Sequence, residues 1–106
     1  MSAWSYLALA GAFEIAFAIS MKFSHGFTHL GATLVTGIAV VGGIGFLTLA
    51  LKGLPVSVAY PVWTAIGALG TVGFGYLVLG EALTPLKILS VVAIAAGVAG
   101  LKAAAA

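Results

Sequence analysis

The sequence predicts an all-α integral membrane protein with four transmembrane helices, folded as a single domain over residues 1–106. Of its 106 residues, 63% are hydrophobic and 6% are charged, whereas a soluble domain carries about 25% charged residues. Four long apolar runs divide the chain. At a rise of about 1.5 Å per residue, each run is long enough to cross a hydrocarbon core of roughly 30 Å.

The first two apolar runs end at recognisable stop signals. Residues 4–21 form the first run, which ends at Lys22, whose ammonium group can reach the membrane surface. Residues 30–51 form the second run. Three residues that commonly end helices follow it, namely Lys52, Gly53 and Pro55.

A predicted loop, LGEALTP, separates the third run from the fourth. The third run covers residues 57–79. Thr84 followed by Pro85 is typical of a helix cap and first turn, so the fourth helix is expected over residues 85–101, ending at Lys102. The alanines after Lys102 are expected to be frayed or unstructured.

Glu14 is the one acidic residue inside the first run. A charge at that depth costs about 2.5 to 3.5 kcal/mol, and such residues face a bundle interior or a water-filled cavity, where they handle ions or protons. No lysine or arginine lies in the interior of any run, so no internal salt bridge neutralises it. An unpaired carboxyl group in a low dielectric favours its protonated form. We therefore expect proton and external cation to bind Glu14 alternately, as exchange transport requires.

Helical spacing places small or aromatic side chains on the face that carries Glu14. The residues expected to line a pocket there are Leu7, Ala10, Gly11 and Phe17. On the third helix, Tyr60 and Trp63 are three residues apart, and aromatic faces attract organic cations within about 6 Å. We expect both rings to form walls of the same site, although Tyr60 is also placed for interfacial anchoring.

Small residues follow one face of the fourth helix. They are Ser90, Ala93, Gly97 and Gly100. Such faces let membrane helices approach closely, so this small-residue stripe is the predicted dimer contact, with packing inside the monomer as the alternative. The lysines divide two against two between the sides of the membrane, so both orientations are open to the chain and an antiparallel homodimer is expected.

The third helix contains a proline and a cluster of glycines, which weaken helical rigidity. They are Pro61, Gly67, Gly70, Gly73 and Gly75. We interpret the cluster as a hinge between two conformations. Its alternative role is close helix packing.

Other classes of protein are disfavoured. The absence of cysteine excludes disulfides and thiol ligands, and a net charge of +2 is too sparse for a nucleic-acid interface. His25 and His29 lie in a predicted loop without a third ligand, so neither a metal nor a cofactor is expected. An enzyme is not expected, while a structural or regulatory membrane subunit and a passive channel stay open as alternatives.

Several blocks of sequence resemble the small multidrug resistance family. They are FE at 13–14, MKFSHGFTHL at 21–30, LPVSVAYPVWTAIGALGT at 54–71 and GVAGLK at 97–102. The resemblance implies a four-helix protomer, an antiparallel dual-topology dimer in the bacterial plasma membrane, and proton-coupled export of organic cations. It also implies that two copies of Glu14 share one site, lined by Tyr60 and Trp63.

Within that family, the WT-x-I-G-A-L-G-T run resembles the guanidinium-exporting branch. That branch places tryptophan where this chain has Phe17 and serine where it has Gly43, so Gly43 is expected to line the pocket without a polar group. Pro61 and Ala65 also depart from its pattern. The resemblance therefore implies export of guanidinium or substituted guanidines with broadened tolerance, with a quaternary ammonium exporter or one subunit of a heterodimer as alternatives.

Overall fold

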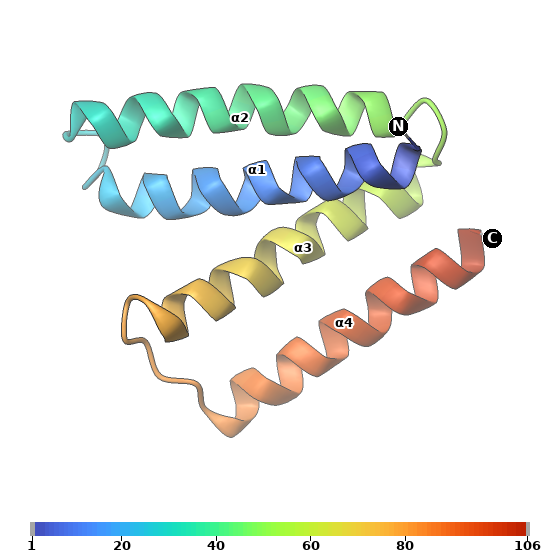
Figure 1. Cartoon of the computed structure of the whole chain (residues 1–106). Coiled ribbons are helices and arrows are strands. Elements are labelled where there is room, and N and C mark those ends of the chain that lie inside the picture. The colour runs from blue at the N-terminus through green and yellow to red at the C-terminus, as the bar shows by residue number, and fades with distance from the viewer. Residues whose placement is uncertain (1, 106) are drawn as a thin grey trace.

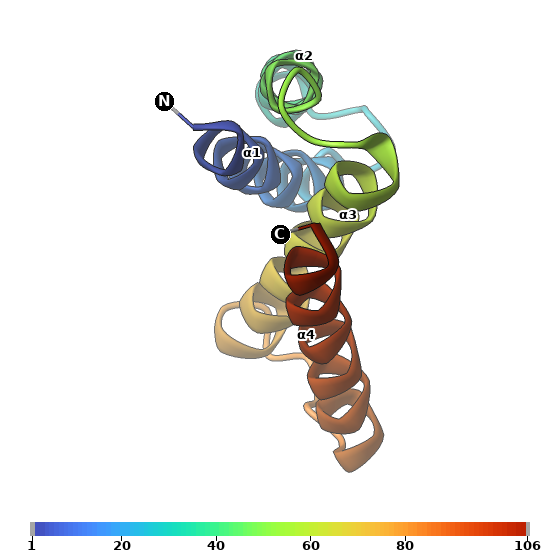
Figure 2. The same cartoon turned by 90° about the vertical axis from the view of Figure 1, so that its right-hand side faces the viewer.

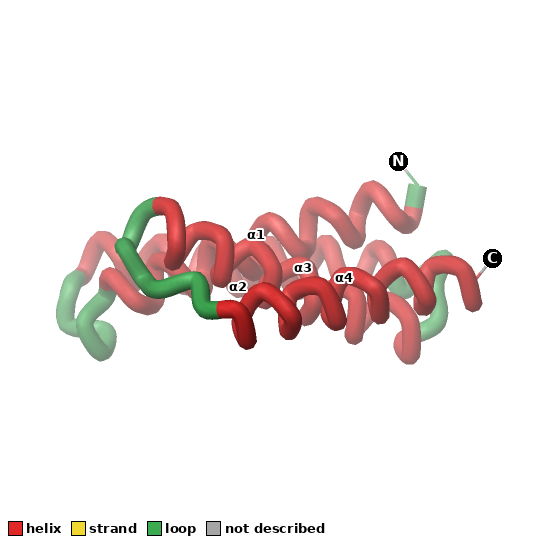
Figure 3. Tube along the Cα trace, turned by 90° about the horizontal axis from the view of Figure 1, so that it is seen from below, coloured by secondary structure: helices red, strands yellow, loops and turns green. Residues whose placement is uncertain are grey.

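The computed structural model describes residues 2–105, which form four α-helices (Figure 1). They are α1 (Ala3–Phe23), α2 (Leu30–Ala50), α3 (Val56–Leu77) and α4 (Pro85–Ala105). All four are long and apolar enough to cross a membrane, which confirms the predicted four-helix membrane fold. Two loops lie at one end of the molecule, while the α2–α3 turn, the start of α1 and the end of α4 lie at the other (Figure 3).

The helix boundaries differ from the prediction most clearly in α4. The predicted helix ends at residue 101 with a frayed alanine tail, whereas α4 continues to Ala105. That expectation is wrong because alanine has the highest helix propensity, and neither glycine nor proline follows Lys102 to end the helix. At the first helix, α1 likewise continues past Lys22 to Phe23.

Polar side chains cap the starts of α2 and α4. Thr84 Oγ1 accepts a hydrogen bond from the backbone N–H of Lys87 at 3.2 Å, which confirms the predicted cap. His29 Nδ1 accepts one from the N–H of Ala32 at 3.0 Å. This loop histidine therefore serves a helix start, and no group of three metal-ligating side chains occurs within residues 2–105.

Helices α1 and α2 run side by side in opposite directions (Figures 1 and 2). A Cβ atom built at Gly42 would lie 2.8 Å from the ring of Phe13, so the ring fills space that only glycine leaves open. Nearer the loop between α1 and α2, the buried hydroxyl groups of Ser20 and Thr36 are 2.7 Å apart and share a hydrogen bond. Close approach and this buried polar contact fix the pairing of the two helices.

Glycines also bring α1 and α3 together. A Cβ atom at Gly11 of α1 would collide with Ile66 of α3, and one at Gly70 of α3 would collide with Ile15 of α1. Each helix therefore inserts an isoleucine above a glycine of its partner. In lipid, where apolar surface gains little by leaving the solvent, such contact by van der Waals packing is a main source of helix association.

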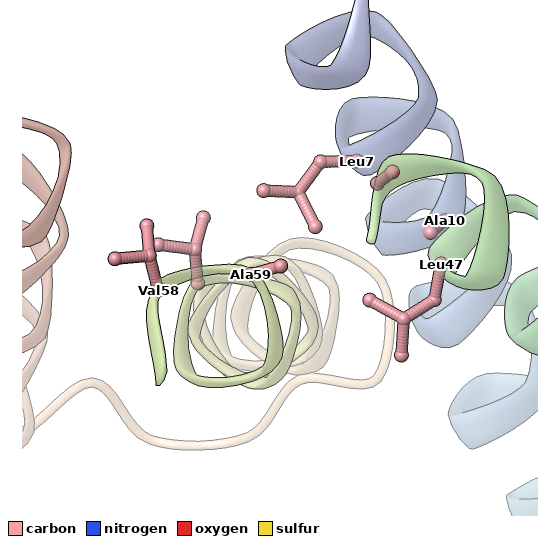
Figure 4. Close-up of a cluster of buried hydrophobic side chains, with 7 residues drawn as sticks. Leu7, Ala10, Leu47, Val58 and Ala59 are labelled. Atoms are coloured by element: carbon pink, nitrogen blue, oxygen red, sulfur yellow. The ribbon is translucent and has the colours of Figure 1, made fainter. Parts of the chain in front are cut away.

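The apolar core lies where the start of α1, the end of α2 and the start of α3 meet. Its buried side chains are Leu7, Ala10, Leu47, Ala50, Val58, Ala59 and Val62. Figure 4 shows Leu7 between the α3 residues Val58 and Ala59 on one side and Leu47 of α2 on the other. This cluster holds the three helices together at one end.

Helix α4 stands apart from α1 and α2 and runs beside α3 (Figure 2). None of its residues is buried. Near its end, the Lys102 ammonium group lies 5.4 Å from the centre of the Trp4 ring, a cation–π contact with the start of α1. Nothing lies within 4 Å of a Cβ atom built at Gly97 or Gly100. Packing inside the monomer is therefore not the role of these two glycines, and the dimer contact stays a prediction.

The glycine cluster of α3 divides by environment. Gly67 and Gly70 face side chains of α1, and a Cβ atom at Gly75 would collide with Glu81 Oε1 of the following loop. Gly73 has open space around it. These contacts support a packing role for three of the four glycines, while the hinge stays a prediction.

The contrast between Gly70 and Gly73 gives a test of the α1–α3 contact. We expect Gly70→Ala to lower the free energy of unfolding by about 1–3 kcal/mol relative to Gly73→Ala, because its methyl group overpacks against Ile15. The measurement is detergent–SDS unfolding followed by circular dichroism. Equal unfolding midpoints for the two variants would contradict the contact.

Candidate functional site

Glu14 lies in the middle of α1, where its side chain contacts α3. A Cβ atom built at the buried Gly67 would lie 2.6 Å from Glu14 Cδ and 2.8 Å from Oε2. The missing side chain at Gly67 therefore lets the carboxyl group lie against the α3 backbone. Even a methyl group at this position would have to displace the carboxyl group.

One oxygen of that carboxyl group is buried without a hydrogen-bond partner. Glu14 Oε2 accepts no hydrogen bond from the part of the chain that the structure describes, residues 2–105. The four lysines lie at helix ends or in a turn, at Lys22, Lys52, Lys87 and Lys102. An ionised carboxylate buried at this depth is costly without a partner. A proton on Glu14 or a cation from outside the chain would supply the missing partner.

Trp63 lies one helical turn before Gly67 and contacts α1 as well. Its indole Nε1–H donates a hydrogen bond of 3.0 Å to the backbone carbonyl of Ala10. Ala10 lies one turn before Glu14 on α1. The Trp63–Ala10 and Gly67–Glu14 contacts therefore occur on successive turns of the same two helices. The indole N–H thus points to the backbone of α1. The half-buried Trp63 ring lies beside the turn of α1 that carries Glu14.

Tyr60 lies against Trp63 and reaches the outside of the protomer. The two ring centres are 5.3 Å apart in an edge-to-face arrangement, and 52% of Tyr60 is exposed. The aromatic pair expected from the spacing of these residues is present. Its part in binding a cation stays a prediction.

The predicted pocket-lining residues of α1 have two kinds of surroundings. Leu7 and Ala10 are buried in the core, and Gly11 is buried beneath Ile66. In this protomer all three residues pack between helices. Phe17 is half-buried three residues beyond Glu14, and the lining role of these residues stays a prediction.

Gly43 of α2 is buried beside the backbone of α1 near Glu14. A Cβ atom built there would lie 3.4 Å from Phe13 Cβ, 3.6 Å from the Ala10 oxygen and 3.9 Å from the Glu14 nitrogen. The position is thus next to the carboxyl-bearing turn and holds no polar side chain, while its pocket-lining role stays a prediction. Neither Gly43 nor Phe17 supplies a side-chain donor to Glu14.

The role of Gly67 beside the carboxyl group was not predicted, since all four glycines of α3 were assigned to one cluster. One signal could have distinguished it. Gly67 is four residues after Trp63 and therefore shares its helix face, whereas Gly73 does not follow that spacing.

The hydrogen bond between α3 and α1 gives a testable expectation. We expect Trp63→Phe to lower the free energy of unfolding by about 0.5–1.5 kcal/mol, because the ring remains but the donor to the Ala10 carbonyl is lost. Tyr60→Phe is the control, because it keeps the aromatic contact. Unfolding of the purified variants in detergent–SDS mixtures measures the difference, and a Trp63→Phe variant as stable as the control would refute the expectation.

Comparisons with known proteins agree with this arrangement. A family model described as Small Multidrug Resistance protein matches residues 2–94. Proteins named guanidinium exporter from Proteus vulgaris, Citrobacter freundii and Yersinia pseudotuberculosis are each 44% identical to this chain. The matches cover 95%, 93% and 96% of this chain and 97%, 94% and 98% of those proteins, respectively. With its four spanning helices, the chain is a multi-pass protein of the bacterial plasma membrane, and it belongs to the small multidrug resistance family.

Proposed function

We propose that this protein exports guanidinium or substituted guanidines in exchange for protons, with Glu14 binding the two alternately. The observation that carries the proposal is the buried carboxyl oxygen without a partner. The relatives named guanidinium exporter support the class of substrate. The protein is on this view a transporter and not an enzyme.

The chemistry of Glu14 supplies the coupling. In the absence of a cation, protonation removes the charge and the cost of burying it. A guanidinium ion presents N–H donors in a plane, which matches the two oxygens of a carboxylate. One carboxylate cannot hold a proton and pair with a cation at the same time, so release of one accompanies binding of the other.

The aromatic residues of α3 suit a planar cation. Trp63 lies on the turn next to Gly67, and Tyr60 stands edge-on against it with half of its surface exposed. A delocalised cation over such rings gains roughly 0.5–2 kcal/mol, depending on how far it is desolvated. We assign these rings to orient the substrate beside Glu14.

We propose that the working unit is an antiparallel homodimer with two copies of Glu14 in one site. Lys22 lies in the last turn of α1 and Lys87 in the first turn of α4, while Lys52 follows α2 and Lys102 lies in the last turn of α4. The lysines thus divide evenly between the two ends of the four helices, so charge does not favour either orientation. The small-residue stripe of α4 supplies a contact, since Gly97 and Gly100 are open to a partner.

A broader substrate range is the second candidate. Gly43 places no donor beside the Glu14 turn, and Phe17 is apolar. A site that loses hydrogen-bonding groups discriminates less in favour of a hydrogen-bonding substrate. Quaternary ammonium ions, which need no acceptor, are therefore the competitors to compare with guanidinium.

The first test is the Glu14→Gln variant in proteoliposomes on a solid-supported membrane. We expect wild-type protein to give guanidinium and methylguanidinium currents, and the variant to give none above background, because an amide neither ionises nor releases a proton. Tetraethylammonium serves as the quaternary ammonium competitor. Circular dichroism and elution volume establish that the variant is folded.

Three outcomes are informative. Guanidinium currents from Glu14→Gln equal to wild type would overturn the mechanism. Wild-type currents with tetraethylammonium alone would replace guanidinium with quaternary ammonium ions as the substrate class. Silence toward all three cations would favour a heterodimer subunit or a role without transport.

A second test moves the carboxyl group without removing it. We expect Gly67→Ala to reduce guanidinium transport about tenfold, because its methyl group displaces Glu14 from the α3 backbone. Gly73→Ala is the matched control on the same helix, where a methyl group meets open space. Equal transport by the two variants would show that the position of the carboxyl group against α3 is not needed.

A further inference from the structure

A cavity lies away from Glu14, between α3, α4 and the loop of residues 78–84. Its volume is about 560 Å³, within the range of small-molecule sites, roughly 300–1,000 Å³. Two opposite charges line it, Glu81 and Lys87, together with polar groups of Tyr76 and Thr84. The proposed transport cycle makes no use of these groups.

Both charged side chains are directed to this cavity by contacts with the backbone. The Lys87 ammonium group donates a hydrogen bond of 2.7 Å to the Ala82 carbonyl, which leaves two of its three N–H donors for a ligand. The Glu81 backbone N–H donates to the Gly75 carbonyl at 2.9 Å, and the Glu81 carboxylate contacts Gly75 where a Cβ atom would collide. Glu81 and Lys87 thus both border the cavity, each with a contact to the backbone.

The depth of the cavity in the membrane identifies its surroundings. Helix α3 has 22 residues and α4 has 21, so each spans the hydrocarbon core, and the loop between them lies at the level of lipid headgroups. An adjoining groove of about 310 Å³ lies beside the cavity between the same two helices, and Leu77, Leu83 and Ile88 line it near the loop. It shares Val72, Tyr76 and Val91 with the cavity, and Leu69 and Val92 add to its apolar wall.

We propose that this cavity and groove bind a zwitterionic membrane phospholipid. Lys87 would pair with its phosphate and Glu81 with its ammonium group, while one acyl chain occupies the groove. The observation that selects a lipid is the order of chemistry within the cavity. Glu81 and Lys87 lie at the headgroup level, while Val91 and Ile94 lie one to two helical turns deeper than Lys87. An ethanolamine headgroup fits best because its ammonium N–H groups can donate to the Glu81 carboxylate.

The experiment uses the purified full-length protein in detergent, equilibrated with equal amounts of phosphatidylethanolamine and phosphatidylglycerol of identical acyl chains. Native mass spectrometry counts the lipid retained. We expect phosphatidylethanolamine to be retained about tenfold over phosphatidylglycerol, which offers no ammonium group to Glu81. Lys87→Gln should lower phosphatidylethanolamine retention about tenfold, and Glu81→Gln should abolish the preference between the two lipids. Lys52→Gln, at the opposite end of the bundle, is the matched control and should behave as wild type.

Two results would overturn the proposal. One is equal retention of the two lipids by wild-type protein, which would mean that the charges do not read the headgroup. The other is crosslinking of a Val91→Cys variant to a second copy of the chain in native membranes, with no lipid retained by the wild type, which would make the groove a protein interface. Neither result bears on guanidinium transport. The lipid site can therefore be disproved without affecting the proposed transport function.

Discussion

The contact between Glu14 and Gly67 is the constraint on which the arrangement of α1 and α3 depends. A carboxyl group lies against a helix backbone with one buried oxygen unpartnered. Packing on either side holds it there. Trp63 bonds to the Ala10 carbonyl one turn before it, and Ile15 inserts over Gly70 just beyond it. The glycines thus permit the close approach, and the close approach buries one oxygen of the carboxyl group without a hydrogen-bond partner.

Most of the fold followed from the sequence because membrane insertion imposes simple rules. Four apolar runs of sufficient length predict four helices, since a backbone in lipid must satisfy its own hydrogen bonds. The cap at Thr84 and the loop before it were also predictable from local chemistry. Glu14 could be identified from the sequence because burying a carboxylate in the membrane is costly. Such a residue is therefore expected to have a functional role and not a structural one.

The contacts between helices were not predictable from the sequence. In a soluble protein a periodic pattern of apolar residues marks the buried face, but here nearly every position is apolar and no such pattern separates packed from lipid-facing residues. Gly67, Gly70 and Gly73 are alike in sequence, yet only the first two contact α1. Their difference arises from the crossing of α1 and α3, which depends on side chains far apart in the chain.

Helix α4 contributes to both the proposed assembly and the proposed lipid site, and the two surfaces share Ser90. Val91 and Ile94 line the cavity beside α3, while Gly97 and Gly100 have open space around them. At about 100° per residue, the groove residues Val91 and Val92 average roughly half a turn from the two glycines, whereas the cavity residues Leu86 and Ser90 lie on the glycines' side of the helix. A second copy on the small-residue stripe would therefore leave the groove open and would border the cavity at Leu86 and Ser90. A lipid held there would pack between α3 and α4 in each protomer and add to the contacts that α4 makes with α3.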